Sequence, residues 1–174
     1  MNTVLFDKIK PPIEIKTDRL TITDICKKDK ELYADLYLDD ELNKWWGYDY
    51  REDLNGEEPT PDYFFSFQKK LKEIKEEYLF IVRHNDIMIG ELVLHNFSEK
   101  SVEMGFRFFR EYQGKGFAIE SALALKNYVK TTLKAKTLKS RCFKENIPSR
   151  HLIERLGLSL TSEDKTHYYF ETIL

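Results

Sequence analysis

The chain has 174 residues, of which 41% are hydrophobic, 33% are charged and 14% are aromatic, and its formal net charge is −2. This length suits one domain with one core, and the aromatic content argues against disorder. The net charge excludes a general attraction to nucleic acid, because proteins that bind polyanions usually carry a basic surplus.

Cysteine usage and hydropathy exclude further classes of protein. Cys26 and Cys142 lie far apart without a CxxC spacing, so neither a disulfide framework nor a zinc site is indicated. The four histidines have no HExxH spacing, which gives no case for a metal. No run approaches the roughly eighteen apolar residues of a membrane span, and Met1 to Lys10 lacks the apolar run of a signal peptide. We expect a cytoplasmic protein.

The beginning of the chain predicts an arm and a first strand. Residues 1–16 include two prolines and are expected to lie as an extended N-terminal arm on a domain formed by residues 17–174. Apolar positions at Leu20, Ile22 and Ile25 predict a strand after this arm.

Two helices and three strands are predicted next. Residues 27–38 have apolar side chains near helical spacing, and the stretch 46–61, with two glycines and two prolines, predicts a loop. Pro61 begins a helix that extends to about residue 77. Three strand-like runs, joined by the tight turn Asn85-Asp86 and by residues 97–100, predict an antiparallel meander over residues 78–83, 87–95 and 101–109.

The last third of the chain predicts alternating helices and strands. A helix with apolar positions at Ala118, Ala122, Leu125 and Val129 is followed by a strand, a second helix, and a final strand rich in aromatic residues. These elements are expected at 136–143, 146–156 and 166–173. Their order alone indicates one domain with a mixed sheet.

A segment with two glycines, Gln113-Gly114-Lys115-Gly116-Phe117-Ala118, joins the meander to the following helix. Glycine permits torsions that other residues resist and removes side chains that would keep an anion from the main chain. A helix beginning near Lys115 adds unpaired N–H groups and the positive end of its dipole, which suit a diphosphate. The segment is a candidate phosphate cradle, although glycines before a helix also serve turn geometry alone.

Two better-known phosphate motifs do not fit this segment. The dinucleotide fingerprint requires a small residue three places after the second glycine, where Ile119 stands. The P-loop requires lysine and then serine or threonine after its last glycine, but Phe117 follows Gly116. A nucleotide-binding protein is therefore disfavoured.

The pattern Gln-x-x-Gly-x-Ala, formed by residues 113–118, resembles the coenzyme A pyrophosphate loop of the GNAT family of N-acetyltransferases. Three further motifs, in the right order, resemble the RimJ/RimL-like branch, which acetylates the amino termini of ribosomal proteins. They are Thr17-Asp18-Arg19-Leu20 in the first strand, Glu103-Met104-Gly105-Phe106 in the fourth strand, and Asn146-Ile147-Pro148-Ser149 in the last helix. The resemblance covers roughly residues 17–173. It implies an α/β fold of one domain, with a mostly antiparallel mixed sheet that is splayed at the coenzyme site.

The resemblance also implies acetyl-CoA as cosubstrate and no metal. In the family, the loop holds the pyrophosphate and residues on the last helix orient the pantetheine arm. Main-chain groups of the fourth strand pair with that arm, and a splay or bulge leaves N–H groups free for the thioester oxygen. The same residues also have explanations that need no coenzyme. Phe106 and Phe108 could simply be core residues of a strand, and Asn146 with Ser149 could form a local helix N-cap. The implied coenzyme-binding residues are Phe106, Arg107, Phe108, Gln113, Gly114, Lys115, Gly116, Phe117, Ala118, Asn146 and Ser149.

Acetyl transfer requires a neutral amine. At pH 7 an amine with a pKa of about 10.4 is only about 0.04% neutral, whereas an α-amine with a pKa of about 7.7 is about one-sixth neutral. Glu103 matches the acidic position on the branch's fourth strand and is the leading candidate for the base, directly or through water. Glu91, on the neighbouring strand, is second. Either carboxylate could instead be a solvated strand residue.

The departing thiolate must gain a proton, and many members of the family use a tyrosine on the last helix for this step. This chain has Ile153 at that position. Ser149, a water molecule, Tyr168 and Tyr169 remain as candidates. The missing tyrosine keeps a second class open, namely an acyl-CoA-binding module with little or no catalysis.

The acceptor side is the least defined by sequence. Trp45 and Trp46 precede a loop with five acidic residues, and an aromatic wall with an acidic rim could attract a cationic amine. With Glu91, these tryptophans are the predicted acceptor-binding residues. We predict an N-acetyltransferase in which the amine attacks the thioester directly. The acceptor is a protein amino terminus, a polyamine or an aminoglycoside, and a homodimer is left open.

Overall fold

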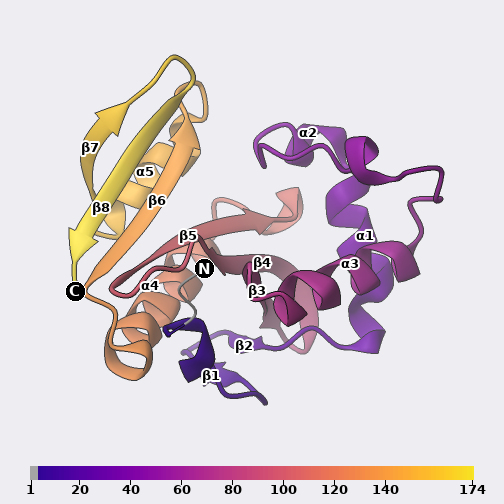
Figure 1. Ribbon diagram of the computed structural model, residues 1–174, viewed down its shortest axis with the longest axis horizontal. Coiled ribbons are helices and arrows are strands. Elements are labelled where there is room, and N and C mark those ends of the chain that lie inside the picture. The colour runs from indigo at the N-terminus through magenta and orange to yellow at the C-terminus, as the bar shows by residue number, and fades with distance from the viewer. Residues whose placement is uncertain (1–3) are drawn as a thin grey trace.

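In the computed structural model, which describes residues 4–174, one sheet of eight strands forms the centre of the molecule (Figure 1). The strands lie in the order β1-β2-β3-β4-β5-β6-β8-β7, and each neighbouring pair is antiparallel except β5 and β6. This mixed, mostly antiparallel sheet confirms the predicted fold class. The strands are β1 (Glu14–Lys16), β2 (Thr21–Thr23), β3 (Glu77–His84), β4 (Ile87–His95), β5 (Ser101–Phe108), β6 (Thr137–Phe143), β7 (Ser159–Glu163) and β8 (His167–Ile173).

Helices cover both faces of the sheet. α4 (Phe117–Tyr128) and α5 (Ile147–Arg155) contribute to the larger buried cluster, whereas α1 (Lys30–Leu38) and α3 (Pro61–Glu73) contribute to the second. The short helix α2 (Asp40–Asn43) follows α1. Within residues 4–174, no helix has both the length and the apolar character needed to cross a membrane.

Side-chain alternation along β3 explains how one strand serves two cores. Phe80 and Val82 belong to the cluster that includes α4, and Leu79 and Ile81 belong to the cluster that includes α1 and α3. Successive side chains of a strand point to opposite faces, so a strand covered on both faces is apolar throughout. The turn Asn85-Asp86 has positive φ at both residues, as expected for a tight hairpin turn.

Three short elements differ from the sequence-based expectation. β1 lies within the segment predicted as an arm, β7 follows α5 where no strand was predicted, and α2 follows α1. β7 is exposed along its whole length, so it has no apolar alternation to reveal it. The segment before β1 is anchored by its buried apolar residues, which are Leu5, Phe6, Ile9 and Ile13.

The parallel pair of β5 and β6 separates after a short run. The two strands are in register from Ser101 opposite Thr137 to Glu103 opposite Lys139, and no further pairing follows. The sheet therefore opens into a fork beyond Glu103, with β5 on one side and β6 on the other.

Candidate active site

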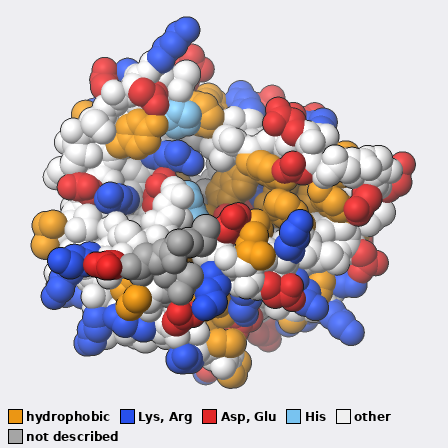
Figure 2. Space-filling view, in the orientation of Figure 1, with side chains coloured by type: hydrophobic (Ala, Val, Ile, Leu, Met, Phe, Trp, Pro, Cys, Tyr) orange, Lys and Arg blue, Asp and Glu red, His pale blue; other side chains and the backbone are white. Residues whose placement is uncertain are grey.

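A cleft of about 1270 Å³ opens at this fork. It lies between β5, β6 and the beginning of α5, and it extends to α3 and to the loop that follows α2. In Figure 2, hydrophobic side chains gather near the middle of the face shown, with acidic side chains beside them. Six of the predicted site residues line the cleft, namely Trp45, Trp46, Glu103, Phe106, Asn146 and Ser149.

The free edge of β5 presents main-chain groups to the fork. The N–H of Phe109 donates to the carbonyl of Ile89 at 3.1 Å, on the β4 side. Because main-chain groups alternate in direction along a strand, those of Phe106 and Phe108 face the fork. Those of Arg107 face β4 instead. The predicted main-chain contact between Arg107 and a pantetheine arm does not fit this geometry, because these groups are directed at β4.

Two side chains mark the limits of this free edge. The Ser140 hydroxyl donates to the carbonyl of Met104 at 2.8 Å, where β6 begins to leave β5. At the other end, the Gln113 amide nitrogen donates to the carbonyl of Phe108 at 2.9 Å. Gln113 thereby ties the glycine segment to β5. Phe106, which lies between these two contacts, keeps its main-chain groups available.

The glycine segment adopts the conformation that its sequence suggested. Gly114 and Gly116 have φ values of 72° and 81°, in the left-handed region, and α4 begins at Phe117. A Cβ atom at Gly114 would meet nothing within 4 Å. Within residues 4–174, no hydrogen bond uses the N–H groups of residues 114–118. Free donors at the beginning of a helix are a suitable site for an anion, so this segment fits a diphosphate.

The Thr17-x-Arg19 motif holds the segment in place. Arg19 donates from Nη1 to the carbonyl of Lys115 at 3.0 Å and from Nε to a carboxylate oxygen of Glu120 at 2.6 Å. The Thr17 hydroxyl donates to Glu120 at 2.6 Å, and the Arg19 guanidinium lies 4.6 Å from the centroid of the Phe117 ring. The Thr17-x-Arg19 motif therefore orients the loop and the first turn of α4.

Glu103 sits where the fork begins, with polar neighbours on several sides. The Asn96 amide donates to its Oε2 at 2.9 Å, and Arg141 Nε lies 3.2 Å from its Oε1. His95 Nε2 lies 3.8 Å from the same Oε1. Burial lowers the pKa of His95, with Glu103 acting in the opposite direction and Arg141 adding to the decrease.

Sequence reasoning missed His95 and Arg141 as cleft residues. Both line the cleft beside Glu103. The signal for His95 was its place in the register, since it lies directly opposite Glu103 in the β4–β5 pair. That register depends on a five-residue connection and could not be fixed from the sequence. Arg141 reaches Glu103 across the parallel pair from a distant segment.

Glu91 is not a cleft residue, which corrects its predicted contact with the acceptor. It is fully buried, and Arg107 donates from Nε to its Oε1 at 2.7 Å. The Arg107 guanidinium lies between the rings of Tyr37 and Trp46, 4.3 and 4.4 Å from their centroids. It also donates to the side-chain oxygen of Asn43 at 3.2 Å. Burial raises the pKa of Glu91, and Arg107 opposes that increase.

Two tryptophans connect the acceptor side with both arms of the fork. A Cβ atom at Gly105 of β5 would lie 3.6 Å from the Trp46 ring, so the ring packs closely over this glycine. The Trp45 ring centroid lies 5.9 Å from that of Phe143 on β6. The loop after α2 thus spans the cleft. Acidic side chains dominate its lining, with Asp53, Glu57, Glu58, Asp62, Glu76, Glu77 and Glu103 against the cations Lys70 and Arg141.

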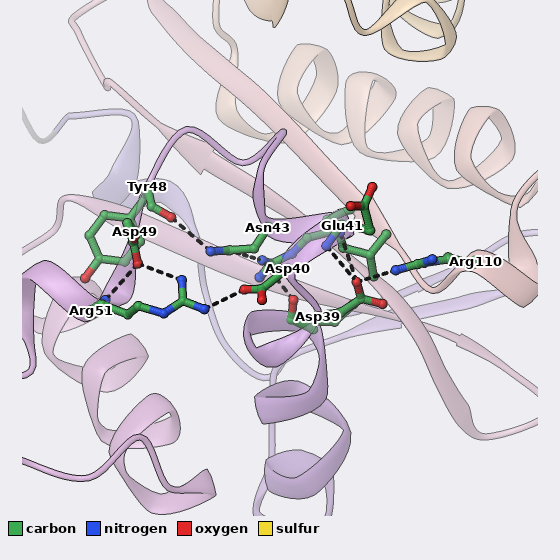
Figure 3. Close-up of polar contacts among 11 residues, drawn as sticks. Asp39, Asp40, Glu41, Asn43, Tyr48, Asp49, Arg51 and Arg110 are labelled. Carbon is green, nitrogen blue, oxygen red and sulfur yellow. Dashed lines mark hydrogen bonds and ion pairs between the residues drawn. The ribbon is translucent and has the colours of Figure 1, made fainter.

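Ion pairs and hydrogen bonds fix the position of α2 (Figure 3). Asp39 caps the helix by accepting from two main-chain N–H groups, and Arg110, just before the glycine segment, donates to it at 2.6 Å. Farther along, Arg51 bonds to both Asp40 and Asp49. The Asp39–Arg110 contact links the beginning of α2 to the segment just before the glycine segment.

The fold places the candidate proton donors for the thiolate in different environments. Ile153 is fully buried and belongs to the larger core. Ser149 lines the cleft, whereas Tyr168 and Tyr169 are not among the described residues that do so. The Ser149 N–H donates to the side-chain oxygen of Asn146 at 3.2 Å, which is the helix cap that the sequence also allowed.

With this geometry established, the comparisons with known proteins define the class. Residues 19–159 match the model of a family described as acetyltransferase (GNAT) domain. The chain therefore belongs to the GNAT family of acetyltransferases, with acetyl-CoA as cosubstrate, as the motifs predicted.

Individual relatives agree with this assignment. The chain is 31% identical over 127 residues to the uncharacterized N-acetyltransferase YnaD of Bacillus subtilis (strain 168), covering 68% of this chain and 75% of that protein. Mycobacterium smegmatis RimJ in complex with CoA-disulfide has a TM-score of 0.78 at 15% identity, over 94% of this chain and 88% of that one. Spermidine N-acetyltransferase from Vibrio cholerae, in complex with CoA and spermine, has a TM-score of 0.75 at 20% identity, over 90% and 96%. The fold neighbours thus include the branch that the motifs indicated.

Proposed function

We propose that this chain binds acetyl-CoA along the fork and transfers the acetyl group directly to a primary amine of a cationic acceptor. One observation carries the proposal. The free edge of β5 has Phe106 in the acid-lined cleft, and at its far end Phe108 accepts a hydrogen bond from Gln113 of the glycine segment, whose N–H groups at residues 114–118 have no partner within residues 4–174.

The coenzyme side follows from the free main-chain groups. The N–H groups of residues 114–118 would bind the pyrophosphate, since they have no protein partner within residues 4–174 and lie at the beginning of α4. Phe106 and Phe108 would pair with the pantetheine arm through their main chains. A free N–H at Phe106 would then donate to the thioester oxygen as it gains charge, and such a donor is worth about 3 kcal/mol in acyl transfer.

The proposed acceptor site rests on the negative charge of the cleft lining. Seven carboxylates and two permanent cations line the cleft, so the field within it attracts an ammonium group. Trp45 and Trp46 add aromatic surfaces that favour a cation. We assign Glu103 to the reacting nitrogen and Ser149 to the departing thiolate, because both side chains line the cleft.

Among cationic amines, a polyamine is the first acceptor to test. Several carboxylates spread along the cleft suit a chain with several positive charges, and one fold neighbour is a spermidine N-acetyltransferase. Aminoglycosides share this charge. A protein amino terminus presents a single charge and makes less use of the acidic lining.

An acyl-CoA-binding module without catalysis is the second candidate. Ile153 favours it, since a buried aliphatic side chain has no proton to give to a thiolate. This module would bind coenzyme A in the same place and leave the amine unreacted.

Thiol release from acetyl-CoA separates the two candidates. The assay uses spermidine, an aminoglycoside and a peptide with a free amino terminus, each with and without the chain. We expect thiol release above background that saturates with spermidine. Saturable binding of coenzyme A without thiol release from any amine would instead support the binding module.

A further inference from the structure

His95 is a partly buried titratable side chain at the fork to which no role has been given so far. It is the last residue of β4, and its strand neighbours are Glu77 on β3 and Glu103 on β5. Its side chain is 23% exposed and lines the cleft. The ring therefore has access to a bound acceptor while its surroundings are fixed by the sheet.

The two oxygens of Glu103 are already engaged by donors. Asn96 donates to Oε2 at 2.9 Å, and Arg141 Nε lies 3.2 Å from Oε1. A proton arriving from an amine must therefore compete with an amide and a guanidinium. This competition makes Glu103 better suited to attract and orient a cation than to take its proton.

The imidazole of His95 is free to accept a proton. Within residues 4–174, no hydrogen bond to its ring nitrogens is made, and the 3.8 Å between Nε2 and Glu103 Oε1 exceeds a hydrogen-bond distance. A neutral imidazole offers one nitrogen lone pair, and a carboxylate beside it stabilises the imidazolium that forms. The charged groups around it are Glu77 and Glu103 on the adjacent strands and Arg141 from β6.

We propose that His95 is the general base of the acetyl transfer and that Glu103 is a positioning residue that supports it. This inference rests on the proposed function. The acceptor enters as an ammonium and gives one proton to His95, and its nitrogen then forms a bond to the acyl carbon. The carbon–sulfur bond breaks with its electron pair on sulfur, which takes the second nitrogen proton, directly or through Ser149 or water. His95 returns its proton to solvent, so the net products are the amide, the free thiol and one proton.

Substitution of His95 tests the assignment, with His151 as a matched control. His151 is exposed on α5 and has no part in the cleft. We expect His95→Gln to lower kcat with spermidine by about 100-fold or more, the usual contribution of a general base. The Kd for coenzyme A should change less than about twofold, and His151→Gln should match the wild type.

The pH profile distinguishes a base from a structural residue. In the wild type, kcat/KM should fall on the acid side as His95 becomes protonated. Glu103→Gln should move this limb to lower pH, because it removes the carboxylate that favours the imidazolium and leaves Arg141 to oppose it. In His95→Ala, added imidazole should occupy the space left by the missing side chain and raise kcat of the variant at least about tenfold.

The outcomes separate this inference from the function on which it rests. Suppose that the wild type is active and that kcat of His95→Gln is within threefold of the wild-type value, or that the acid limb of the kcat/KM profile is unchanged in this variant. Either result would overturn the role of His95 and leave the proposed function standing. A wild-type chain that binds coenzyme A and releases no thiol with any amine would overturn the proposed function and this inference together. Loss of coenzyme binding in His95→Gln, without rescue of His95→Ala by imidazole, would indicate a structural role and also overturn the assignment.

Discussion

At the scale of single residues, the backbone conformation of the glycine segment determines which main-chain N–H groups are free to bind an anion. Gly116 holds a φ of 81° immediately before α4, and the N–H groups around it have no protein partner within residues 4–174. An L-residue in this left-handed conformation costs roughly 1–2 kcal/mol. The position therefore requires glycine for the turn, and the turn exposes the donors.

Gly116→Ala should weaken coenzyme binding more than it weakens the fold. Its Cβ atom would lie 3.1 Å from Nη2 of Arg19, the residue whose Nη1 donates to the Lys115 carbonyl. We expect the Kd for coenzyme A, measured by titration calorimetry, to rise about tenfold or more. Gly157→Ala is the control, since Gly157 has a φ of 83° and lies after α5. It should lose similar stability and keep its coenzyme affinity within about twofold, and an equal loss of affinity in both variants would argue against the cradle.

The buried pair of Glu91 and Arg107 is a second residue-scale feature, and it is structural. Both side chains are almost completely buried, and the arginine joins β4, β5, α1 and α2 through its contacts. Removing one partner of such a pair leaves an uncompensated charge in the interior.

Arg107→Met should destabilise the fold by about 3–5 kcal/mol in urea unfolding, because it leaves Glu91 without its counter-charge. The double variant Glu91→Leu, Arg107→Met should recover part of this loss, since no buried charge remains. Lys16→Met, at the exposed pair with Glu14, serves as control and should change stability by less than about 1 kcal/mol. A cost for Arg107→Met as small as that of the control would refute the structural role.

At the scale of elements, the loop after α2 is the part of the cleft that we propose meets the acceptor. Before it, the Asp39–Arg110 contact fixes the position of α2 (Figure 3). Near the beginning of the loop, the Trp45 ring contacts that of Phe143. Farther along, Glu57 and Glu58 line the cleft, whereas Glu52 of the same loop does not. The loop therefore contains a matched set of carboxylates that differ in their position relative to the cleft.

The double variant Glu57→Gln, Glu58→Gln should raise the KM for spermidine about tenfold, because two charges that attract the acceptor are lost. The Kd for coenzyme A should not change. Glu52→Gln removes a charge from the same loop and should leave both constants within about twofold. Equal effects of Glu52→Gln and of the double variant would show that only the net charge of the loop matters.

The elements also show what the sequence could and could not predict. The meander and the glycine segment were predictable, because apolar periodicity, tight turns and glycine conformation are local properties. β7 was not, since its five residues are all exposed and carry no periodic signal. His95 and Arg141 were not recognised because their proximity to Glu103 depends on strand register and on the parallel pairing of distant segments. Glu91 was predicted on the acceptor side because sequence alone did not reveal that Arg107 would bury it.

At the scale of the whole molecule, the partly buried carboxyl group of Glu77 in the cleft lining makes stability depend on pH. Burial raises the pKa of Glu77 to about 7, although Gln68 donates to its Oε1 at 3.0 Å. The folded state therefore holds a proton that the unfolded state releases above about pH 4.5. The stabilisation from Glu77 is complete below that pH and is lost as the pH rises towards 7. The pKa of His95 is lowered by burial, so its contribution has the opposite sign.

Glu77→Gln should reduce the fall in unfolding free energy between pH 5 and pH 8. The amide has the shape of the protonated acid and does not titrate, so the variant should lose about 1–3 kcal/mol less than the wild type over this range. Urea unfolding at several pH values measures this difference. An identical decline in both proteins would show that Glu77 titrates in the folded state as it does in the unfolded chain.

The most direct test of the whole account is a crystal structure of this chain with coenzyme A. We expect the pyrophosphate within hydrogen-bond distance of the N–H groups of residues 114–118, the pantetheine arm along the free edge of β5, and the sulfur at the fork beside Phe106 and Glu103. A coenzyme bound outside the fork, with these N–H groups facing solvent, would contradict the account.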